Sequence, residues 1–224
     1  MLYNFIVARF RNRASAGREL LQKLIKFKND PNAVVVGLLR GGIVTASEVA
    51  MGLSLPLGFL VIKKIGAPND PELAIGAVTD SGEVFIDEKM ISEMKIDKSY
   101  VESETAKKRE EARMRTEKYQ MYVKNPSPSD KTVILVDDGI ATGATMIAAV
   151  RSMSKYRARK VVVAIPMGPS EHLEKVRREV DEIVSLGEDL NLSSVGEYYD
   201  EFSEVTDEEA IKILSNFNYK WARK

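Results

Sequence analysis

One stretch of the chain, residues 133–146, places reactive side chains beside elements that could present them to a ligand. Four aliphatic residues form a run of strand length, and two adjacent carboxylates, Asp137 and Asp138, follow it directly. A run of mostly small and hydroxyl residues then leads into an apolar helical segment, and it consists of Gly139, Ile140, Ala141, Thr142, Gly143, Ala144 and Thr145. Open α/β sheets bind ligands at the carboxyl ends of their strands, and backbone N–H groups at a helix start bind anions. The stretch therefore predicts a ligand that carries a phosphate together with hydroxyls or a metal ion.

This stretch resembles the 5-phosphoribosyl-1-pyrophosphate (PRPP) signature of type I phosphoribosyltransferases. The residues that match the signature position for position are Asp137, Asp138, Thr142, Gly143 and Thr145. The resemblance implies that the two carboxylates hold the 2- and 3-hydroxyls of ribose, and that the loop 139–145 surrounds the 5-phosphate. A buried strand followed by an ordinary acidic turn is the alternative, which explains the apolar run but not the spacing. Helix capping by the two threonines is compatible with either interpretation.

Two basic clusters follow predicted strands at the same edge of the sheet. They are Arg40, Gly41 and Gly42 after the apolar run 33–39, and Lys63 and Lys64 after the run 57–62. An arginine can bind two oxygens in a fork, and glycines lack the Cβ atoms that would keep a ligand away from the backbone. In the family that the chain resembles, similar loops bind the pyrophosphate of PRPP. Glycines end many strands and adjacent lysines often lie at solvated strand ends, so a structural role is the alternative for both clusters.

The resemblance also implies a cofactor, Mg²⁺, which would bridge pyrophosphate oxygens and ribose hydroxyls with few protein ligands. Asp137 and Asp138 are the candidate protein ligands, and they would also stabilise a cation-like ribose carbon electrostatically. One position departs from the hypoxanthine-guanine enzymes, in which an aspartate stands three positions after the second acid. This chain has Ala141 there, as adenine- and uracil-type enzymes do. The departure disfavours hypoxanthine and guanine as acceptors and leaves no acid or base at that position.

The whole chain is most similar to an uncharacterised stand-alone subgroup of bacterial and archaeal phosphoribosyltransferases. The shared stretches are the F-x-x-R motif of Phe10 and Arg13 and the segments 38–42, 63–78, 136–146 and 198–209. Asn12 stands where the subgroup usually has an aspartate. Bases are recognised in this fold by a variable hood, in which Tyr198, Tyr199 and Phe202 could stack on a planar ring. Anchoring of the C-terminal segment to the core is the slightly favoured alternative for these rings.

The elements expected around these residues form an α/β fold with an open, mostly parallel, doubly wound sheet. Strands are predicted at 33–39, 57–62, 74–78, 83–86, 133–136, 160–165 and 182–186, and helices at 14–28, 43–53, 99–122, 170–180 and from about 206. Strands that alternate with helices and join through right-handed crossovers build a parallel sheet. We expect one domain over residues 1–224, with an insertion at about 66–128 and a C-terminal hood at about 187–224, both over the carboxyl edge.

Composition excludes several other kinds of site. The 224 residues include 33 basic and 33 acidic side chains, so no excess charge indicates nucleic acid or a membrane surface as a partner. The chain has no cysteine, and His172 is its only histidine, which excludes thiol chemistry and a multi-histidine metal site. His172 lies in a polar helical run, where exposure to solvent is expected. No apolar run approaches the roughly 18 residues of a membrane span, so the cytoplasm is the expected location.

Two classes of function follow from these residues. The first is a Mg²⁺-dependent enzyme that transfers the phosphoribosyl group of PRPP to a nucleobase-like acceptor and releases pyrophosphate. The second is a PRPP-binding regulatory protein without catalysis, against which the interleaved charges of 99–122 speak, because they give no basic face for nucleic acid. A dinucleotide-binding fold is excluded, since no G-x-G-x-x-G follows the first strand. A homodimer remains open.

Overall fold

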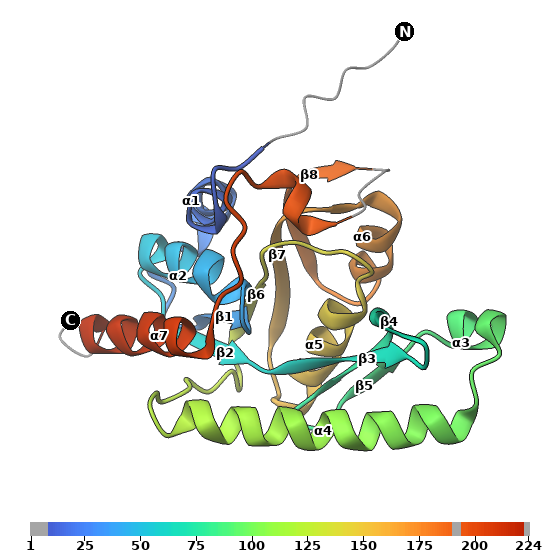
Figure 1. Ribbon diagram of the computed structural model, residues 1–224. Coiled ribbons are helices and arrows are strands. Elements are labelled where there is room, and N and C mark those ends of the chain that lie inside the picture. The colour runs from blue at the N-terminus through green and yellow to red at the C-terminus, as the bar shows by residue number, and fades with distance from the viewer. Residues whose placement is uncertain (1–8, 190–193, 222–224) are drawn as a thin grey trace, which may run out of the picture.

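The computed structural model describes residues 9–189 and 194–221, which fold around a parallel sheet of five strands (Figure 1). The strands lie in the order β2-β1-β6-β7-β8, and every neighbouring pair is parallel. Their bounds are Ala33–Leu38 for β1, Leu57–Leu60 for β2, Thr132–Val136 for β6, Lys160–Pro169 for β7 and Glu182–Asp189 for β8. The predicted α/β fold class with a parallel sheet is confirmed.

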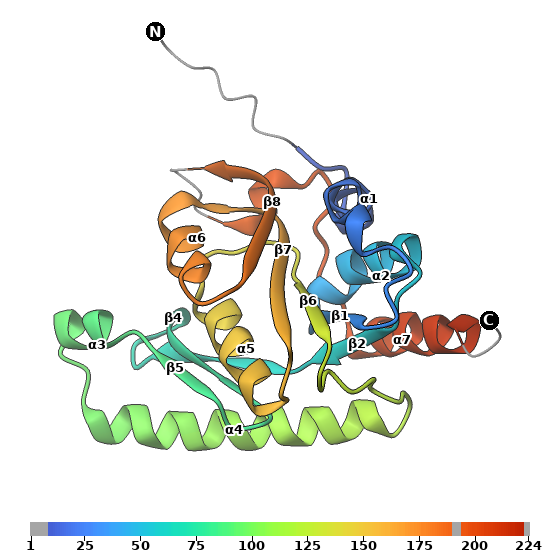
Figure 2. The ribbon, with the colours of Figure 1, turned by 180° about the vertical axis from the view of Figure 1, so that it is seen from behind.

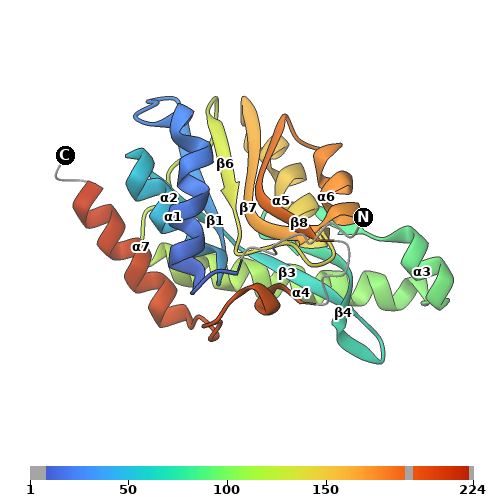
Figure 3. The same ribbon diagram turned by 90° about the horizontal axis from the view of Figure 1, so that it is seen from above.

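Helices cover both faces of this sheet, as the view from above shows (Figure 3). One face carries α1 (Arg13–Leu24, continued by a 3₁₀ turn, Ile25–Phe27) and α2 (Gly42–Leu53), and the other carries α5 (Ala144–Lys155) and α6 (Ser170–Arg177). Successive side chains of a strand point to opposite faces. In β1, Val35 accordingly packs in the cluster with α1 and α2, while Val34 and Val36 pack in the cluster with α5. Burial on both faces explains the continuous apolar runs of these strands.

The strands β1 and β6 are neighbours, but the chain leaves them in opposite directions. From β1 it passes through α2 to β2, and from β6 it passes through α5 to β7. The loops after the two strands therefore separate at the carboxyl edge and leave a crevice between them. In open α/β sheets this switch in direction is the place where ligands bind.

A second, antiparallel sheet interrupts the alternation. Its strands are β3 (Ile62–Ala67), β4 (Asp70–Thr79) and β5 (Val84–Ile86), followed by helices α3 (Glu88–Met94) and α4 (Lys98–Gln120). The single strand expected at 57–62 is thus divided, because β2 ends at Leu60 and Ile62 already pairs with Thr79 in the second sheet. Figures 1 and 2 show α4 running beneath this sheet, whose strands contact α5 as well. Only the start of β3 borders the crevice.

The segment that follows residue 194 crosses the carboxyl edge and meets the start of the described chain. Phe10 forms an isolated parallel bridge with Tyr199, and its N–H donates to the carbonyl of Tyr198 at 2.7 Å. Asn12 begins α1 as its N-cap, accepting from the N–H of Ser15 at 3.1 Å, while the Ser15 hydroxyl accepts from the Asn12 N–H. Asparagine and aspartate cap helices about equally well, so the departure at position 12 preserves this role.

The last helix, α7 (Asp207–Trp221), packs against α2 and β2. Its first residue, Asp207, accepts a hydrogen bond from the hydroxyl of Tyr119 at 3.0 Å and pairs with Lys118, so α7 is joined to α4. Among the described residues of the expected hood, therefore, the segment 194–206 lies at the carboxyl edge, and α7 lies beside the sheet. None of the described helices has the length and apolar character needed to cross a bilayer.

Candidate functional site

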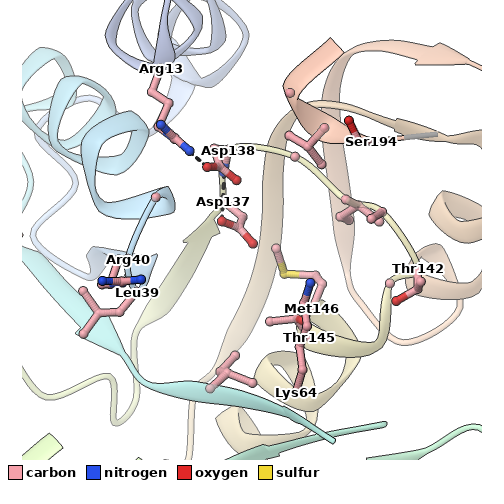
Figure 4. Close-up of a pocket in the computed structure, with 18 of the residues that line it drawn as sticks. Arg13, Leu39, Arg40, Lys64, Asp137, Asp138, Thr142, Thr145, Met146 and Ser194 are labelled. Atoms are coloured by element: carbon pink, nitrogen blue, oxygen red, sulfur yellow. Dashed lines mark hydrogen bonds and ion pairs between the residues drawn. The ribbon is translucent and has the colours of Figure 1, made fainter. Parts of the chain in front are cut away.

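A cavity of about 520 Å³ lies in the crevice between the loops that follow β1 and β6 (Figure 4). Among the residues nominated from the sequence, those that line it are Arg40, Gly41, Lys64, Asp137, Asp138, Gly139, Ile140, Ala141, Thr142, Gly143, Thr145 and Phe202. The lining residues without such a nomination are Arg13, Leu39, Ile62, Met146, Ser194, Val195 and Gly196. The structure thus brings together three segments that the sequence indicated separately, and it adds a wall from the segment 194–202.

The two acids lie at the end of β6 and form a connected pair. The backbone N–H of Asp138 donates to Oδ1 of Asp137 at 2.9 Å. Burial, followed by the neighbouring charge of Asp138, raises the pKa of Asp137 well above its usual range, and the nearby Lys64 opposes this shift. Two carboxylates held this close favour a ligand that brings a cation or hydrogen-bond donors.

Arg13, the first residue of α1, neutralises the second acid. Its Nε donates to Oδ2 of Asp138 at 2.6 Å, with the two side chains only 10% and 15% exposed. Its Nη1 donates to the carbonyl of Ser203 at 2.7 Å, and its guanidinium lies 3.7 Å from the ring centre of Phe202. Sequence patterns assigned no role to Arg13, although the F-x-x-R motif contains it. Because 125 positions separate Arg13 from Asp138, no local pattern could connect them.

The two glycines after Arg40 are needed for packing against the two acids. A Cβ atom on Gly41 would lie 2.1 Å from Oδ2 of Asp138, and one on Gly42 would lie 2.6 Å from Oδ1 of Asp137. Gly42 itself does not line the cavity. The glycines therefore allow the start of α2 to lie against the acid pair, in addition to any approach of a ligand. The peptide bond between Leu39 and Arg40 is cis.

The side chain of Arg40 is already paired in this structure. Its Nη2 donates to Oε1 of Glu204, and the Arg40 side chain is 29% exposed while that of Glu204 is 75% exposed. Glu204 lies in the same segment as Phe202 and Ser203, which contact Arg13. A carboxylate on a guanidinium occupies the position that a phosphate oxygen would take.

The loop after Asp138 leads into the start of α5 and presents mainly backbone. Gly143 is the N-cap of α5 with φ of +83°, a conformation that other residues rarely adopt. The first N–H groups of a helix have no partners within the helix, and the hydroxyl of Thr142 accepts only a long bond of 3.5 Å from the N–H of Ala144. Ala144 itself is buried and lies outside the lining. This end of α5 has the donors and the shape that bind a phosphate.

His172, expected to be exposed, is half-buried and supports this loop. His172 lies on α6, and its ring Nδ1 contacts the carbonyl oxygen of Ala141. The side chain of Ala141 is only a methyl group, and His172 is not among the residues that line the cavity. Neither residue therefore places an acid or base at the position that the hypoxanthine-guanine enzymes fill with aspartate.

The two lysines of β3 separate, because neighbouring residues of a strand point to opposite faces. Lys64 lines the cavity, whereas Lys63 lies outside the lining with its Nζ 3.3 Å from Oε2 of Glu111 on α4. The two lysines, expected together at the end of one strand, therefore have different positions. Lys64 lines the cavity, and Lys63 forms an ion pair that links the second sheet to α4.

The aromatic residues considered for base stacking also divide. Tyr198 and Tyr199 are each 4% exposed and lie outside the lining. The hydroxyl of Tyr199 donates to the carbonyl of Asp138 at 2.6 Å, and that of Tyr198 donates to the carboxylate of Asp189. Both tyrosines therefore anchor the C-terminal segment, the role that the sequence slightly favoured.

Phe202 lines the cavity, but its ring is already in contact on its faces. The Tyr199 ring stacks on it with centres 4.9 Å apart, and the guanidinium of Arg13 lies 3.7 Å from its centre. With a second ring and a guanidinium this close, the Phe202 ring has less surface left for a stacked base.

Comparisons with known proteins identify the family of the chain. A family model described as "Phosphoribosyl transferase domain" matches residues 7–201. Two Mycobacterium tuberculosis proteins whose names carry the words phosphoribosyl transferase, MT0597 and Rv0571c, are each 33% identical to the chain over 213 residues, which is 95% of this chain and 48% of theirs. The chain thus spans about half the length of these relatives. The crystal structure of TT1426 from Thermus thermophilus is 39% identical with a TM-score of 0.77, and the match covers 93% of this chain and 99% of that one.

Proposed function

Because the chain belongs to the phosphoribosyl transferase family, we propose that it transfers the phosphoribosyl group of PRPP to a nitrogenous, nucleobase-like acceptor and releases pyrophosphate. One observation carries the proposal. A single cavity is lined by the loop that begins helix α5, by a pair of partly buried carboxylates and by a loop with a cationic side chain. PRPP has a phosphate, vicinal hydroxyls and a diphosphate in that order along its length.

The 5-phosphate is assigned to the loop 139–145 and the start of α5. Backbone N–H groups and the hydroxyls of Thr142 and Thr145 would donate to its oxygens. Hydrogen bonds to a charged group contribute roughly 1.5–3 kcal/mol each. The helix dipole adds to the attraction, because its positive end points at this loop.

The diphosphate is assigned to the opposite side of the cavity. Arg40 would exchange Glu204 for phosphate oxygens, and Lys64, which lines the same cavity, adds a second cation. Lys63 contributes indirectly in this proposal, by holding Glu111 of α4 and not by contact with the ligand. The two charges would stabilise the pyrophosphate as it leaves.

The acids Asp137 and Asp138 line the same cavity and would accept hydrogen bonds from the ribose hydroxyls. Their negative charge would also stabilise the positive charge that develops on the ribose carbon when the bond to pyrophosphate breaks.

The residues present also fit Mg²⁺. No group of three or more histidine, cysteine, aspartate or glutamate residues suited to a metal occurs among the described residues. Mg²⁺ is nevertheless usually bound by one or two carboxylates together with phosphate oxygens of a ligand. Asp137 and Asp138 would hold it, and it would neutralise charge on the diphosphate when bound.

The acceptor is proposed to enter along the wall formed by Ser194, Val195, Gly196 and Phe202. Ala141 cannot exchange a proton. A nucleobase whose reaction needs no proton donor or acceptor at this position therefore fits best. We therefore propose adenine, uracil or a similar base in preference to hypoxanthine and guanine. A PRPP-binding regulator without catalysis is the second candidate, since the same cavity would bind PRPP without turnover.

Calorimetric titration of PRPP with and without Mg²⁺, followed by a pyrophosphate-release assay with adenine, uracil, hypoxanthine and guanine, tests the proposal. We expect Mg²⁺-dependent binding and release of pyrophosphate with at least one base. Binding without turnover for any base would favour the regulator. Absence of PRPP binding would contradict both candidates.

A further inference from the structure

Arg13 is the only buried lysine or arginine in the described part of the chain. A buried charge is stable only when it is paired and hydrogen-bonded. Arg13 meets this requirement with the carboxylate of Asp138, and it uses its remaining polar and planar surfaces on Ser203 and Phe202. Its contacts therefore join α1, the acid pair and the C-terminal segment at one point of the cavity.

The backbone and the side chain of Asp138 are fixed by different residues. Its carbonyl accepts from the hydroxyl of Tyr199 at 2.6 Å, and its N–H donates to Asp137 at 2.9 Å. Its carboxylate receives the Nε–H of Arg13 at 2.6 Å. Gly41 leaves room for this contact, because a Cβ there would lie 2.9 Å from Nε of Arg13. The orientation of the carboxylate within the cavity thus depends on Arg13.

The same guanidinium also contacts the segment 194–202, which forms one wall of the cavity. Its Nη1 bond to the carbonyl of Ser203 at 2.7 Å holds the backbone next to Phe202, and its plane covers one face of that ring. A guanidinium is planar and has its donors in a fixed fork, whereas an ammonium group is a compact charge without such a plane. Only an arginine can make these three contacts together.

We propose that Arg13 is a positioning residue that orients Asp138 for the ribose hydroxyls and, through Ser203 and Phe202, holds the wall along which the acceptor enters. This role rests on the proposed function. It couples the ribose site to the acceptor site through one side chain that comes from a distant part of the chain. Arg13 acts through Asp138 and Phe202, so its loss changes the binding of ligands that contain ribose but not of free pyrophosphate.

The experiment is calorimetric titration of ribose 5-phosphate, PRPP and inorganic pyrophosphate without Mg²⁺, so that no ion held by Asp138 links that residue to pyrophosphate. Four proteins are compared: wild type, Arg13→Met, Arg13→Lys and Arg18→Met. Arg18 is a matched control, because it lies on the same helix and pairs with a glutamate, Glu48, but is 57% exposed and outside the cavity. Thermal unfolding of every variant checks that it is folded.

Loss of a charge-assisted contact that orients a ligand group corresponds to a change of about tenfold in affinity or more. We expect Arg13→Met to weaken ribose 5-phosphate and PRPP by that factor, Arg13→Lys to restore part of the loss, and Arg18→Met to match the wild type. Pyrophosphate affinity should stay constant throughout. Equal losses for all three ligands would show a general loosening of the site and overturn the proposal, as would unchanged affinities.

Arg13→Met leaves the partly buried carboxylate of Asp138 without its cation, which would destabilise the fold. The double variant Arg13→Met/Asp138→Asn removes both charges and avoids this. If Arg13 acts through Asp138, Arg13→Met should weaken ribose 5-phosphate no further once Asp138 is asparagine. Additive losses in this cycle would overturn the proposal. A wild-type protein that binds pyrophosphate but neither ribose ligand would instead contradict the proposed function.

Discussion

The loops that follow β1 and β6 line the same cavity, but they differ in the groups that they offer to an anion. The loop after β6 presents backbone N–H groups and hydroxyls at the start of α5, and Gly143 gives it a fixed curved shape. The loop after β1 presents one charged side chain, Arg40, which is already paired with Glu204. On the proposed assignment, a phosphate would enter the first loop without displacing a charge, whereas a diphosphate would replace the carboxylate of Glu204 at the second. The difference suggests that one loop supplies affinity and the other supplies discrimination between ligands.

The largest effect should come from the two acids at the end of β6. Asp137→Asn and Asp138→Asn should each reduce phosphoribosyl transfer by about 10²–10³, the usual worth of an electrostatic contact to a charged transition state. Steady-state pyrophosphate release measures the loss, and circular dichroism checks the fold. Asp80→Asn is a suitable control, because Asp80 bonds Thr116 and Tyr156 and is not among the residues that line the cavity. Wild-type turnover in both acid variants would contradict the assignment of the site.

Arg40→Ala should separate the two loops most clearly. It should weaken pyrophosphate and PRPP by about 1.5–3 kcal/mol, since a hydrogen bond to a charged group is lost, and should leave ribose 5-phosphate nearly unchanged. Calorimetric titration of the three ligands measures the difference. Equal losses for ribose 5-phosphate and pyrophosphate would mean that Arg40 does not distinguish one anion site from the other.

Gly143→Ala is the corresponding change in the loop after β6. An alanine at φ of +83° costs about 1–2 kcal/mol in backbone conformation. The loop should relax away from its shape, so ribose 5-phosphate should bind more weakly while pyrophosphate binds as in the wild type. The pattern is the reverse of that for Arg40→Ala. A steric clash would not cause the weaker binding, because the nearest atom to the new Cβ is 3.6 Å away.

The smallest effect concerns the carboxylate that occupies Arg40. Glu204→Gln should strengthen pyrophosphate binding, by roughly 0.2–1 kcal/mol, the range for an exposed ion pair. Glu201→Gln removes the same charge from the same segment, but Glu201 pairs with Arg11 and not with Arg40, so it corrects for the general field. Equal strengthening in both variants would reduce the role of Glu204 to net charge. Weaker binding in Glu204→Gln would show that Glu204 positions Arg40 for the ligand.

The sequence was sufficient for the features that depend on neighbouring residues. The strand–acid–loop–helix order at 133–146 and the alternation of strands and helices predicted the sheet and the crevice, because local periodicity and chain direction decide both. The acid pair and most of the loop after it were found in the same way. What could not be predicted depends on contacts between distant segments. Arg13, Ser194 and Val195 reach the cavity only through the tertiary fold.

The lysine pair shows the limit in detail. The apolar run 57–62 has no signal for a break at Val61, so Lys63 and Lys64 could not be assigned to a strand of a different sheet. Once that strand is known, its alternation separates them at once. The tyrosines show a similar limit, because a ring that stacks on a base and a ring that anchors a segment have the same sequence. Burial, which only the fold determines, distinguishes the two.

The C-terminal segment contacts the start of the described chain, through Phe10 with Tyr198 and Tyr199 and through Arg13 with Ser203. These contacts affect the order in which the site forms during synthesis. Arg13 is made early, but its partner Ser203 lies 190 positions later, and proteins are made from the N-terminus at about 5–20 residues per second. The sheet from β1 to β8 can begin to pair while the last segment is still inside the ribosome. A growing chain could therefore hold its carboxylates and its phosphate loop and still lack the wall beside them. On the proposed function, such a chain would bind PRPP before it could direct the sugar to an acceptor. The late arrival of residues 194–204 would then mark the moment at which the protein becomes able to do both.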